Sequence, residues 1–188
     1  MKTRPSGRPY IYETANLCLR GLQLDDLKGN YANWFNDREV CKYNSHGAFP
    51  KSRGELETYI KSTLVSKDKI VWAIIDKKTL THIGNVCLQC IDWINRSAEF
   101  AVIIGEKDYW GKGYAGSAAS LLLKHGFDKM NLNRIYCGTA ANNTGMKRLA
   151  LRLNMRREGV RRQALYLSGK YVDAYEYGIL RDEFKKTR

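Results

Sequence analysis

The chain has 188 residues, of which 44% are hydrophobic, 27% charged and 11% aromatic, a composition typical of a globular protein with a buried core. Three prolines and no low-complexity tract exclude a mainly disordered or repeat protein, and no apolar run reaches the roughly 18 residues of a membrane span. The 32 basic and 19 acidic residues give a net charge of +13, which implies an anionic ligand: a nucleic acid, an anionic membrane or a phosphate-rich small molecule.

The five cysteines are scattered and odd in number, which favours reduced thiols over a disulfide scaffold. The N-terminus lacks the apolar segment of a secretory signal, so we expect a cytoplasmic protein. Cys87 and Cys90 have the spacing of half a zinc site. In an extended strand, however, two such thiols point to opposite faces, and no second pair follows. We therefore expect no metal.

Residues 1–15 are basic and contain two prolines and a glycine, which predicts a flexible arm. The pattern of apolar residues and of turn signals then predicts, in chain order, a strand at 17–22, a helix at 25–35, a loop at 36–51, a helix at 52–65 that opens on a capping box, strands at 70–76, 83–93 and 98–104, a loop at 105–113, a helix at 114–130, a strand at 134–139, a helix at 144–153 and two strands joined at 168–170. No linker interrupts this series, so 1–188 is expected to form a single α/β (α+β) domain with a mixed sheet of about seven strands and about four helices.

One glycine-rich loop lies between a predicted strand and a predicted helix. Its sequence is Trp110-Gly111-Lys112-Gly113-Tyr114-Ala115-Gly116. Glycines let backbone N–H groups approach an anion, and the N-terminus of a helix adds its positive end. The loop therefore suits a pyrophosphate, although it lacks the spacing of a P-loop. A simple tight turn is the alternative.

The basic residues are densest between 147 and 162, where seven of them accompany the single acidic residue Glu158. A solvated protein face is one interpretation, and an anion site is the other. The aromatic side chains that single-strand nucleic-acid binders place among their cations are absent from this stretch.

The glycine loop resembles motif A of the GNAT N-acetyltransferases, (Gln/Arg)-x-x-Gly-x-(Gly/Ala). Gly113 and Ala115 match this pattern, and Trp110 replaces Gln/Arg, as is common in the RimJ/RimL-like branch. The resemblance extends from about residue 17 to about residue 180. It is carried by the segments Asn16–Arg20, Trp34–Val40, Ile94–Phe100 (which is similar to spermidine N-acetyltransferases) and Asn143 to Gly159, with Asn154 in place of a glycine.

This resemblance implies that acetyl-CoA lies in a V-shaped gap between the fourth and fifth predicted strands. Backbone groups of Val102, Ile103 and Ile104 would pair with the pantetheine arm like an added strand. The loop from Trp110 to Gly116, that is Trp110, Gly111, Lys112, Gly113, Tyr114, Ala115 and Gly116, would hold the pyrophosphate. Asn143 would bond the pantetheine arm, and Lys147 and Arg148 would reach cofactor phosphates.

The implied reaction is direct attack of a primary amine on the thioester, after the amine has lost a proton. Glu99 is the candidate base, by way of a water, because it lies in the strand beside the cofactor; a structurally paired carboxylate is the alternative. Strand alternation places Glu99 and Ile103 on one face and Val102 and Ile104 on the other. The tyrosine with which many members protonate the leaving thiolate is missing, since its position holds Ala150.

The acceptor pocket is expected from the 36–50 loop and the helix before it, with Asp37, Tyr43, Asn44 and His46 as candidates, although His46 also fits a plain loop residue. A chain at +13 disfavours polyamines, so we expect a small amine, such as a nucleotide-linked amino sugar. The alternatives are the N-terminus of a ribosomal protein and, in a different class, a non-catalytic module that binds RNA or the ribosome. No membrane partner is expected, and the protein is expected as a monomer or a homodimer.

Overall fold

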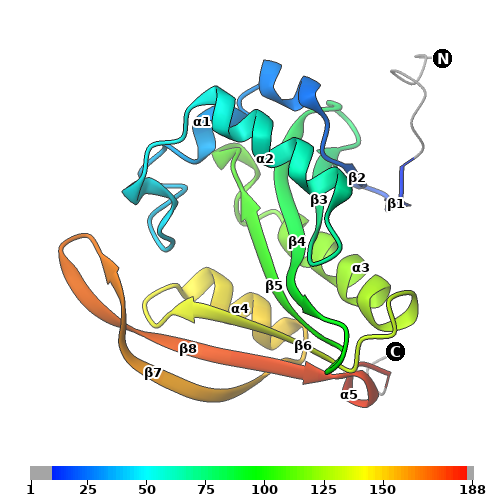
Figure 1. The fold of residues 1–188 in the computed structure, drawn as a ribbon, viewed down its shortest axis with the longest axis vertical. Coiled ribbons are helices and arrows are strands. Elements are labelled where there is room, and N and C mark those ends of the chain that lie inside the picture. Colours follow the sequence, from blue (N-terminus) through cyan, green and yellow to red (C-terminus); the bar gives the residue numbers. More distant parts are fainter. Residues whose placement is uncertain (1–9, 186–188) are drawn as a thin grey trace.

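An open sheet of eight strands, in the order β1-β2-β3-β4-β5-β6-β8-β7, runs through the computed structural model, which describes residues 10–185 (Figure 1). The strands are β1 Tyr12–Glu13, β2 Leu17–Gly21, β3 Ile70–Asp76, β4 His82–Asp92, β5 Ser97–Ile104, β6 Arg134–Ala140, β7 Arg156–Leu167 and β8 Lys170–Leu180. The helices are α1 Tyr31–Trp34, α2 Arg53–Val65, α3 Tyr114–Asp128, α4 Thr144–Arg152 and α5 Arg181–Lys185, with 3-10 turns at η1 Leu24–Lys28, η2 His46–Ala48 and η3 Lys107–Tyr109. The α/β class with its mixed sheet, predicted from the sequence, is confirmed.

Helices cover both faces of the sheet. On one face α3 and α4 pack against alternate residues of the strands, and Leu122, Phe127 and Phe100 are almost fully buried there. On the other face η1, α1 and α2 pack against the intervening residues, and Trp34 and Ile60 are buried there. The two cores follow from the strand period, because successive side chains point to opposite faces.

The sheet opens in its middle. The parallel strands β5 and β6 pair over only three residue pairs, of which the last joins Glu99 to Tyr136. Beyond this pair the two strands diverge, as the green β5 and the yellow β6 of Figure 1 show. This is the V expected between the fourth and fifth predicted strands; the numbers rise by one because β1 lies within the predicted arm.

The structure corrects the sequence prediction at three elements. Residues 12–13 of the predicted arm pair with β2, whereas residues 1–9 lie outside the described part of the chain. The single helix predicted over 25–35 is divided into η1 and α1 at Gly29, a residue that disfavours a helix interior. The short α5 follows β8 without a break and was not predicted. With β1 and α5, the described residues form eight strands and five helices where about seven and four were expected.

Helix α2 shows how closely a local signal can fix an element. The Ser52 hydroxyl accepts a hydrogen bond from the Glu55 N–H, and the Glu55 carboxylate accepts one from the Ser52 N–H. This reciprocal capping box begins the helix at the residue that the sequence predicts. None of the helices in residues 10–185 combines the length and the apolar character needed to cross a membrane.

Candidate active site

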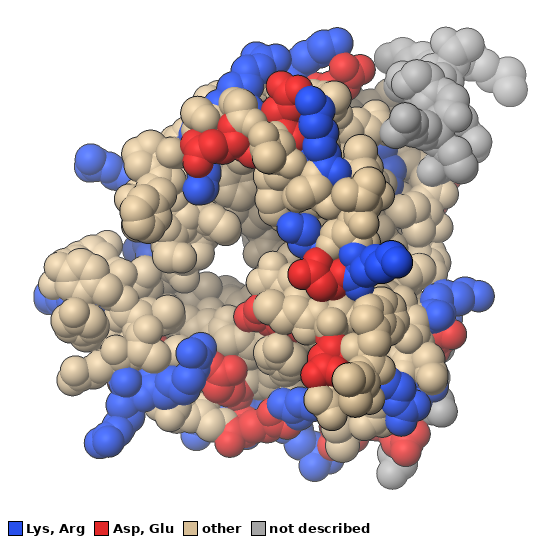
Figure 2. Space-filling view, viewed as in Figure 1, with Lys and Arg blue, Asp and Glu red and all other residues tan. Residues whose placement is uncertain are grey.

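A cleft of about 1910 Å³ occupies the opening between β5 and β6. Figure 2 shows the molecule hollowed between the part that carries α1 and α2 and the part built on β6 to β8. The structure brings fifteen of the predicted site residues to its lining, namely Glu99, Val102, Ile103, Ile104, Trp110, Gly111, Gly113, Tyr114, Ala115, Gly116, Asn143, Arg148, Tyr43, Asn44 and His46. Lys112, Lys147 and Asp37 are not among the lining residues.

The glycine loop enters α3 through two residues in the left-handed region. Gly111 has a φ of +72° and Gly113 a φ of +86°, and Gly113 is the N-cap of the helix. A side chain at either position would strain the backbone. The turn leaves the first N–H groups of α3 without partners inside the helix, which is the arrangement that binds phosphate groups.

Trp110 supports this loop from the cleft side. Its indole N–H donates a hydrogen bond to the carbonyl oxygen of Ile104, at 2.8 Å, and so ties the loop to the end of β5. The residue that replaces the Gln/Arg of the motif therefore anchors the backbone with its ring. The Gly105 N–H donates to Ile83 of β4, so the backbone groups of Ile103 also face β4, whereas those of Val102 and Ile104 face the opening. Because the carbonyl of Ile104 already accepts from the Trp110 indole, Val102 is the better placed of the two to pair with a ligand.

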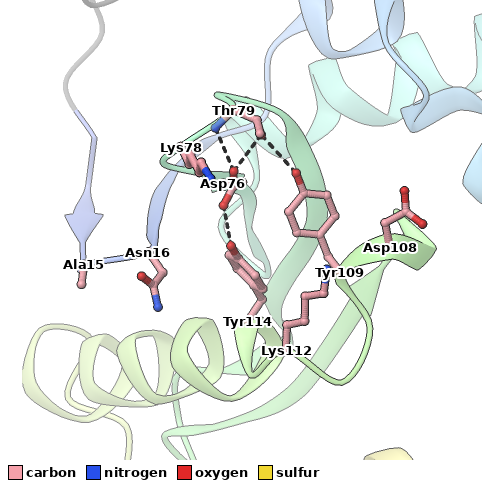
Figure 3. Close-up of a pocket in the computed structure, with 9 residues that line it drawn as sticks. All are labelled: Ala15, Asn16, Asp76, Lys78, Thr79, Asp108, Tyr109, Lys112 and Tyr114. Carbon is pink, nitrogen blue, oxygen red and sulfur yellow. Dashed lines mark hydrogen bonds between the residues drawn. The ribbon is translucent and has the colours of Figure 1, made fainter.

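The side chain of Tyr114 leaves the loop on the side away from this anchor and meets Asp76 at the end of β3 (Figure 3). Its hydroxyl donates to the Asp76 carboxylate, and this hydrogen bond raises the pKa of Tyr114 to about 12. Thr79 also donates to this carboxylate. Burial alone would raise the pKa of Asp76, but these donors lower it on balance.

The basic residues between 147 and 162 differ in their surroundings. Arg148, Arg152 and Arg161 line the cleft. Lys147, in contrast, donates to the carbonyl oxygen of Ala141 at 2.6 Å and lies over the ring of Tyr175. Lys147, predicted to reach cofactor phosphates, thus has a partner at the end of β6 and is not among the residues that line the cleft.

Two further predicted residues also have structural partners. The Lys112 ammonium lies over the ring of Tyr109 and lines a smaller pocket behind the glycine loop, so the residue faces away from the cleft. Asn143 is the N-cap of α4, since its side-chain oxygen accepts from the Met146 N–H at 3.1 Å. Because this oxygen is occupied, Asn143 would have to offer its amide N–H to a pantetheine arm.

Glu99 lies at the vertex of the V, where β5 last pairs with β6. Its carboxylate accepts a hydrogen bond from the Gln89 side chain, at 2.9 Å, across the β4–β5 ladder. Burial raises the pKa of the neighbouring Tyr136, and the charge of Glu99 raises it further. The carboxylate thus borders the cleft at the point where the two strands separate.

The expectation that Cys87 and Cys90 point to opposite faces is wrong. The β4–β5 register shifts between Gln89 and Asp92, and Cys90 adopts a positive φ of 51° within this bulge. The extra residue turns the Cys90 thiol back toward Glu99, with 3.9 Å between sulfur and carboxylate oxygen. Cys87 lies on the same side, in contact with Gln89. Within residues 10–185 no group of three metal-ligating side chains is gathered.

The far wall of the cleft comes from the 36–50 loop and from α2. Tyr43, Asn44 and His46 line it, whereas Asp37 accepts the backbone N–H groups of residues 39 and 40 and forms an ion pair with Lys107. The sequence prediction missed the contributions of α2 and its approach, which are Lys51, Ser52, Gly54, Glu55, Leu56, Thr58 and Tyr59. Apart from the buried Leu56, these residues are exposed or half-buried, and the pattern of an amphipathic helix indicates only its buried face.

Ala150, which stands at the position of the missing tyrosine, does not reach the cleft. Ala150 is fully buried in the core between α4 and the sheet and is not among the lining residues. The tyrosines that do line the cleft are Tyr43, Tyr59, Tyr109 and Tyr114. Burial raises the pKa of Tyr59 to about 12.

Comparisons with known proteins agree with this geometry. Residues 16–156 match the model of the acetyltransferase (GNAT) domain family. The chain is 30% identical, over 91% of its length and 96% of the other's, to an uncharacterized N-acetyltransferase, p20, of Bacillus licheniformis. It is 29% identical, over 90% of its length and 96% of the other's, to a spermidine N(1)-acetyltransferase of Vibrio cholerae. The crystal structure of a Vibrio cholerae spermidine N-acetyltransferase in complex with CoA and spermine superposes with a TM-score of 0.84 at 28% identity, over 92% of this chain and 99% of that one.

Proposed function

Because the chain belongs to the GNAT acetyltransferase family, and is an acetyl-CoA-dependent N-acetyltransferase, we propose that its acceptor is a small primary amine that also carries an anionic group. A nucleotide-linked amino sugar is an acceptor of this kind. The observation that supports this proposal is the charge of the cleft wall, since a substrate must be complementary to the groups that surround it.

Three carboxylates line the cleft: Glu39, Glu55 and Glu99. Glu39 forms an ion pair with Lys107, and Glu55 is occupied by the capping box and by Lys51, whose ammonium lies 3.6 Å away. Glu99 alone of the three has no cation as its partner in the described structure. A polyamine carries further ammonium groups beyond the one that reacts, and these would find no unpaired carboxylate on this wall.

Cations line the same cleft. Lys42 and Lys51 lie on the wall formed by the 36–50 loop and α2, and Arg148, Arg152 and Arg161 lie on the opposite wall. Arg161 is paired with Glu176, and a cofactor with a pyrophosphate and a further phosphate would account for Arg148 and Arg152. Lys51 is paired with Glu55, so Lys42 remains for a negative group of the acceptor, which is why an anionic amine fits this wall better than a polycation.

The residues present fit an acetyl-CoA site, because the left-handed glycines expose N–H groups and β5 has an unpaired edge. Acetyl-CoA supplies the acetyl group as an activated thioester. In the proposed reaction Glu99, by way of a water, accepts a proton from the ammonium, so that the neutral amine can form the new C–N bond. Val102 orients the thioester arm through its backbone groups. The thiolate released when the C–S bond breaks takes its proton from solvent, since Ala150 offers none.

Two measurements test the proposal. Acetyl-CoA at 100 times its Kd should stabilise the folded protein by about 2.7 kcal/mol, which thermal unfolding detects; the absence of a shift at millimolar concentration would remove the acetyltransferase assignment. Thiol release should then be compared for a uridine-diphosphate-linked amino sugar, the same amino sugar without its nucleotide, and spermidine. We expect the highest kcat/KM for the nucleotide-linked amine. A preference for spermidine would contradict the anionic acceptor while leaving the acetyltransferase activity intact.

A further inference from the structure

The carboxylate of Asp76 is buried at the end of β3, where the residue is 3% exposed. One oxygen accepts a hydrogen bond from the Tyr114 hydroxyl, and the other accepts the Thr79 N–H at 2.8 Å and the Thr79 hydroxyl at 2.7 Å. Figure 3 shows these three donors converging on the one carboxylate. Because the Thr79 hydroxyl gives its proton to Asp76, it accepts a hydrogen bond from the Tyr109 hydroxyl, at 3.1 Å.

The two tyrosines lie at opposite ends of the glycine loop. Tyr109 ends η3, immediately before Trp110, and Tyr114 is the first residue of α3, immediately after Gly113. Their rings contact each other edge to face, with 5.4 Å between the ring centroids. Asp76 therefore reaches the exit of the loop directly and its entrance through Thr79, although it belongs to a strand 38 residues earlier in the chain.

We propose that Asp76 is a positioning residue for acetyl-CoA, which fixes the glycine loop in its binding conformation through Tyr114 and Tyr109. The inference rests on the proposed use of this loop for the pyrophosphate. The loop needs such support because two of its residues are glycines with positive φ, and a glycine loses the most conformational freedom when it is ordered. A loop ordered before binding does not lose this freedom on binding, and its affinity for the ligand is higher.

A carboxylate suits this role better than an amide. All of the groups that converge on it are donors: the Tyr114 hydroxyl, the Thr79 N–H and the Thr79 hydroxyl. An asparagine would turn a donor of its own toward one side of this cluster. The hydroxyl groups of Tyr114 and Tyr109 meet Asp76 and Thr79 behind the loop, as Figure 3 shows, so these hydrogen bonds act on the ligand through the position of the loop backbone.

The test compares two hydroxyl deletions on the same helix. Tyr114→Phe removes the bond to Asp76 at the first turn of α3. Tyr12→Phe is the matched control, since the Tyr12 hydroxyl bonds His125 near the other end of α3, at 3.0 Å. The Kd of coenzyme A, measured by calorimetry, should rise about tenfold in Tyr114→Phe, the loss expected for one hydrogen bond to a charged group, and should stay within about twofold of the wild-type value in Tyr12→Phe.

The kinetic signature separates positioning from general destabilisation. In Tyr114→Phe the KM for acetyl-CoA should rise while kcat at saturating acetyl-CoA is largely retained, because a saturating ligand restores the loop. An unchanged Kd in Tyr114→Phe, or an equal rise in both variants, overturns the inference. Should Tyr114→Phe not fold, Tyr109→Phe, which removes the more exposed end of the cluster, must still raise the Kd. A wild-type protein that does not bind coenzyme A would overturn the proposed function itself, and this inference with it.

Discussion

Glu99 occupies the last position at which β5 and β6 pair, and its carboxylate therefore lies between the β4–β5 ladder and the cleft. On one side Gln89 fixes one carboxylate oxygen across the ladder, and on the other side the cleft begins. A base that acts through a water needs this combination of a fixed orientation and access to the ligand.

Replacement of this carboxylate by an amide tests its role. Glu99→Gln should lower kcat by about 10²- to 10⁴-fold, the usual contribution of a positioned base, while the Kd of acetyl-CoA changes little because the loop and β5 backbone are intact. Steady-state kinetics and calorimetry measure the two quantities. Glu57→Gln, which removes a carboxylate paired with Lys61 on the surface of α2, is the control and should retain full activity. Full activity in Glu99→Gln would exclude this residue as the base.

At this scale the sequence indicated which segments line the cleft but not where each side chain points. Trp110, Lys112 and Tyr114 belong to one motif, yet the first faces the end of β5 and the other two face the pocket behind the loop. A loop with two left-handed glycines changes direction within a few residues, so strand or helix periodicity does not apply to it. The direction of the Cys90 thiol was predicted wrongly for a related reason, because a β-bulge breaks the alternation of side chains along a strand.

The contact between α1 and the end of β5 shows how elements fix the acceptor wall. Trp34 lies directly on the backbone of Gly105, so closely that an added Cβ would be 1.9 Å from the indole ring. The indole N–H also donates to Glu106 at 2.9 Å. The absence of a side chain at residue 105 thus lets α1, and the loop that follows it, approach β5.

Gly105→Ala should therefore displace Trp34 and destabilise the fold by about 1–3 kcal/mol, the usual cost of overpacking a core. Gly54→Ala is the opposite case: nothing lies within 4 Å of the added methyl, and in an exposed helical position alanine stabilises by about 0.8–1 kcal/mol. Urea unfolding measures both. If Gly105→Ala proves as stable as the wild-type protein, the close contact does not determine the position of α1.

Elements with strong local signals were predicted to within two residues. The strand over 70–76 and the capped helix over 53–65 are of this kind. The short β1 and α5 could not be predicted, because a two-residue strand exists only through its pairing with β2 and a five-residue helix has little stability of its own. The V between β5 and β6 was predicted only from the resemblance to a family, because no periodicity in the sequence indicates where two paired strands separate.

At the scale of the whole molecule, a buried ion pair makes stability depend on pH. Asp26 in η1 is 6% exposed and accepts two hydrogen bonds from the Arg20 guanidinium, and its Oδ1 lies 3.2 Å from Nδ1 of His82. Burial alone would raise the pKa of Asp26, but the hydrogen bonds from Arg20 and His82 outweigh it and hold the pKa far below its usual range. The folded chain thus binds this proton less readily than the unfolded one.

It follows that this pair stabilises the fold above the ordinary pKa of an aspartate, about 3.9, and that the stabilisation is lost as the pH falls below it. Asp26→Asn should lower the free energy of unfolding at pH 7 by about 3–5 kcal/mol, because it leaves a buried cation without its partner. The difference from the wild-type protein should shrink toward pH 3. Urea unfolding from pH 3 to 7 measures this; a constant difference over that range would contradict the assignment.

The short pairing between β5 and β6 also bears on self-association. Beyond Glu99 and Tyr136 each strand presents a row of unpaired backbone groups, and such rows are the templates on which unrelated chains add strands and aggregate. Here the two rows face each other inside one sheet rather than at its rim. The two edge strands of the sheet are instead the two-residue β1 and β7, which carries four arginines and two bulges, features that discourage a neighbouring strand. The unpaired backbone groups of β5 and β6 thus lie inside the V. A narrow extended ligand has access to them there, and the sheet of another molecule does not.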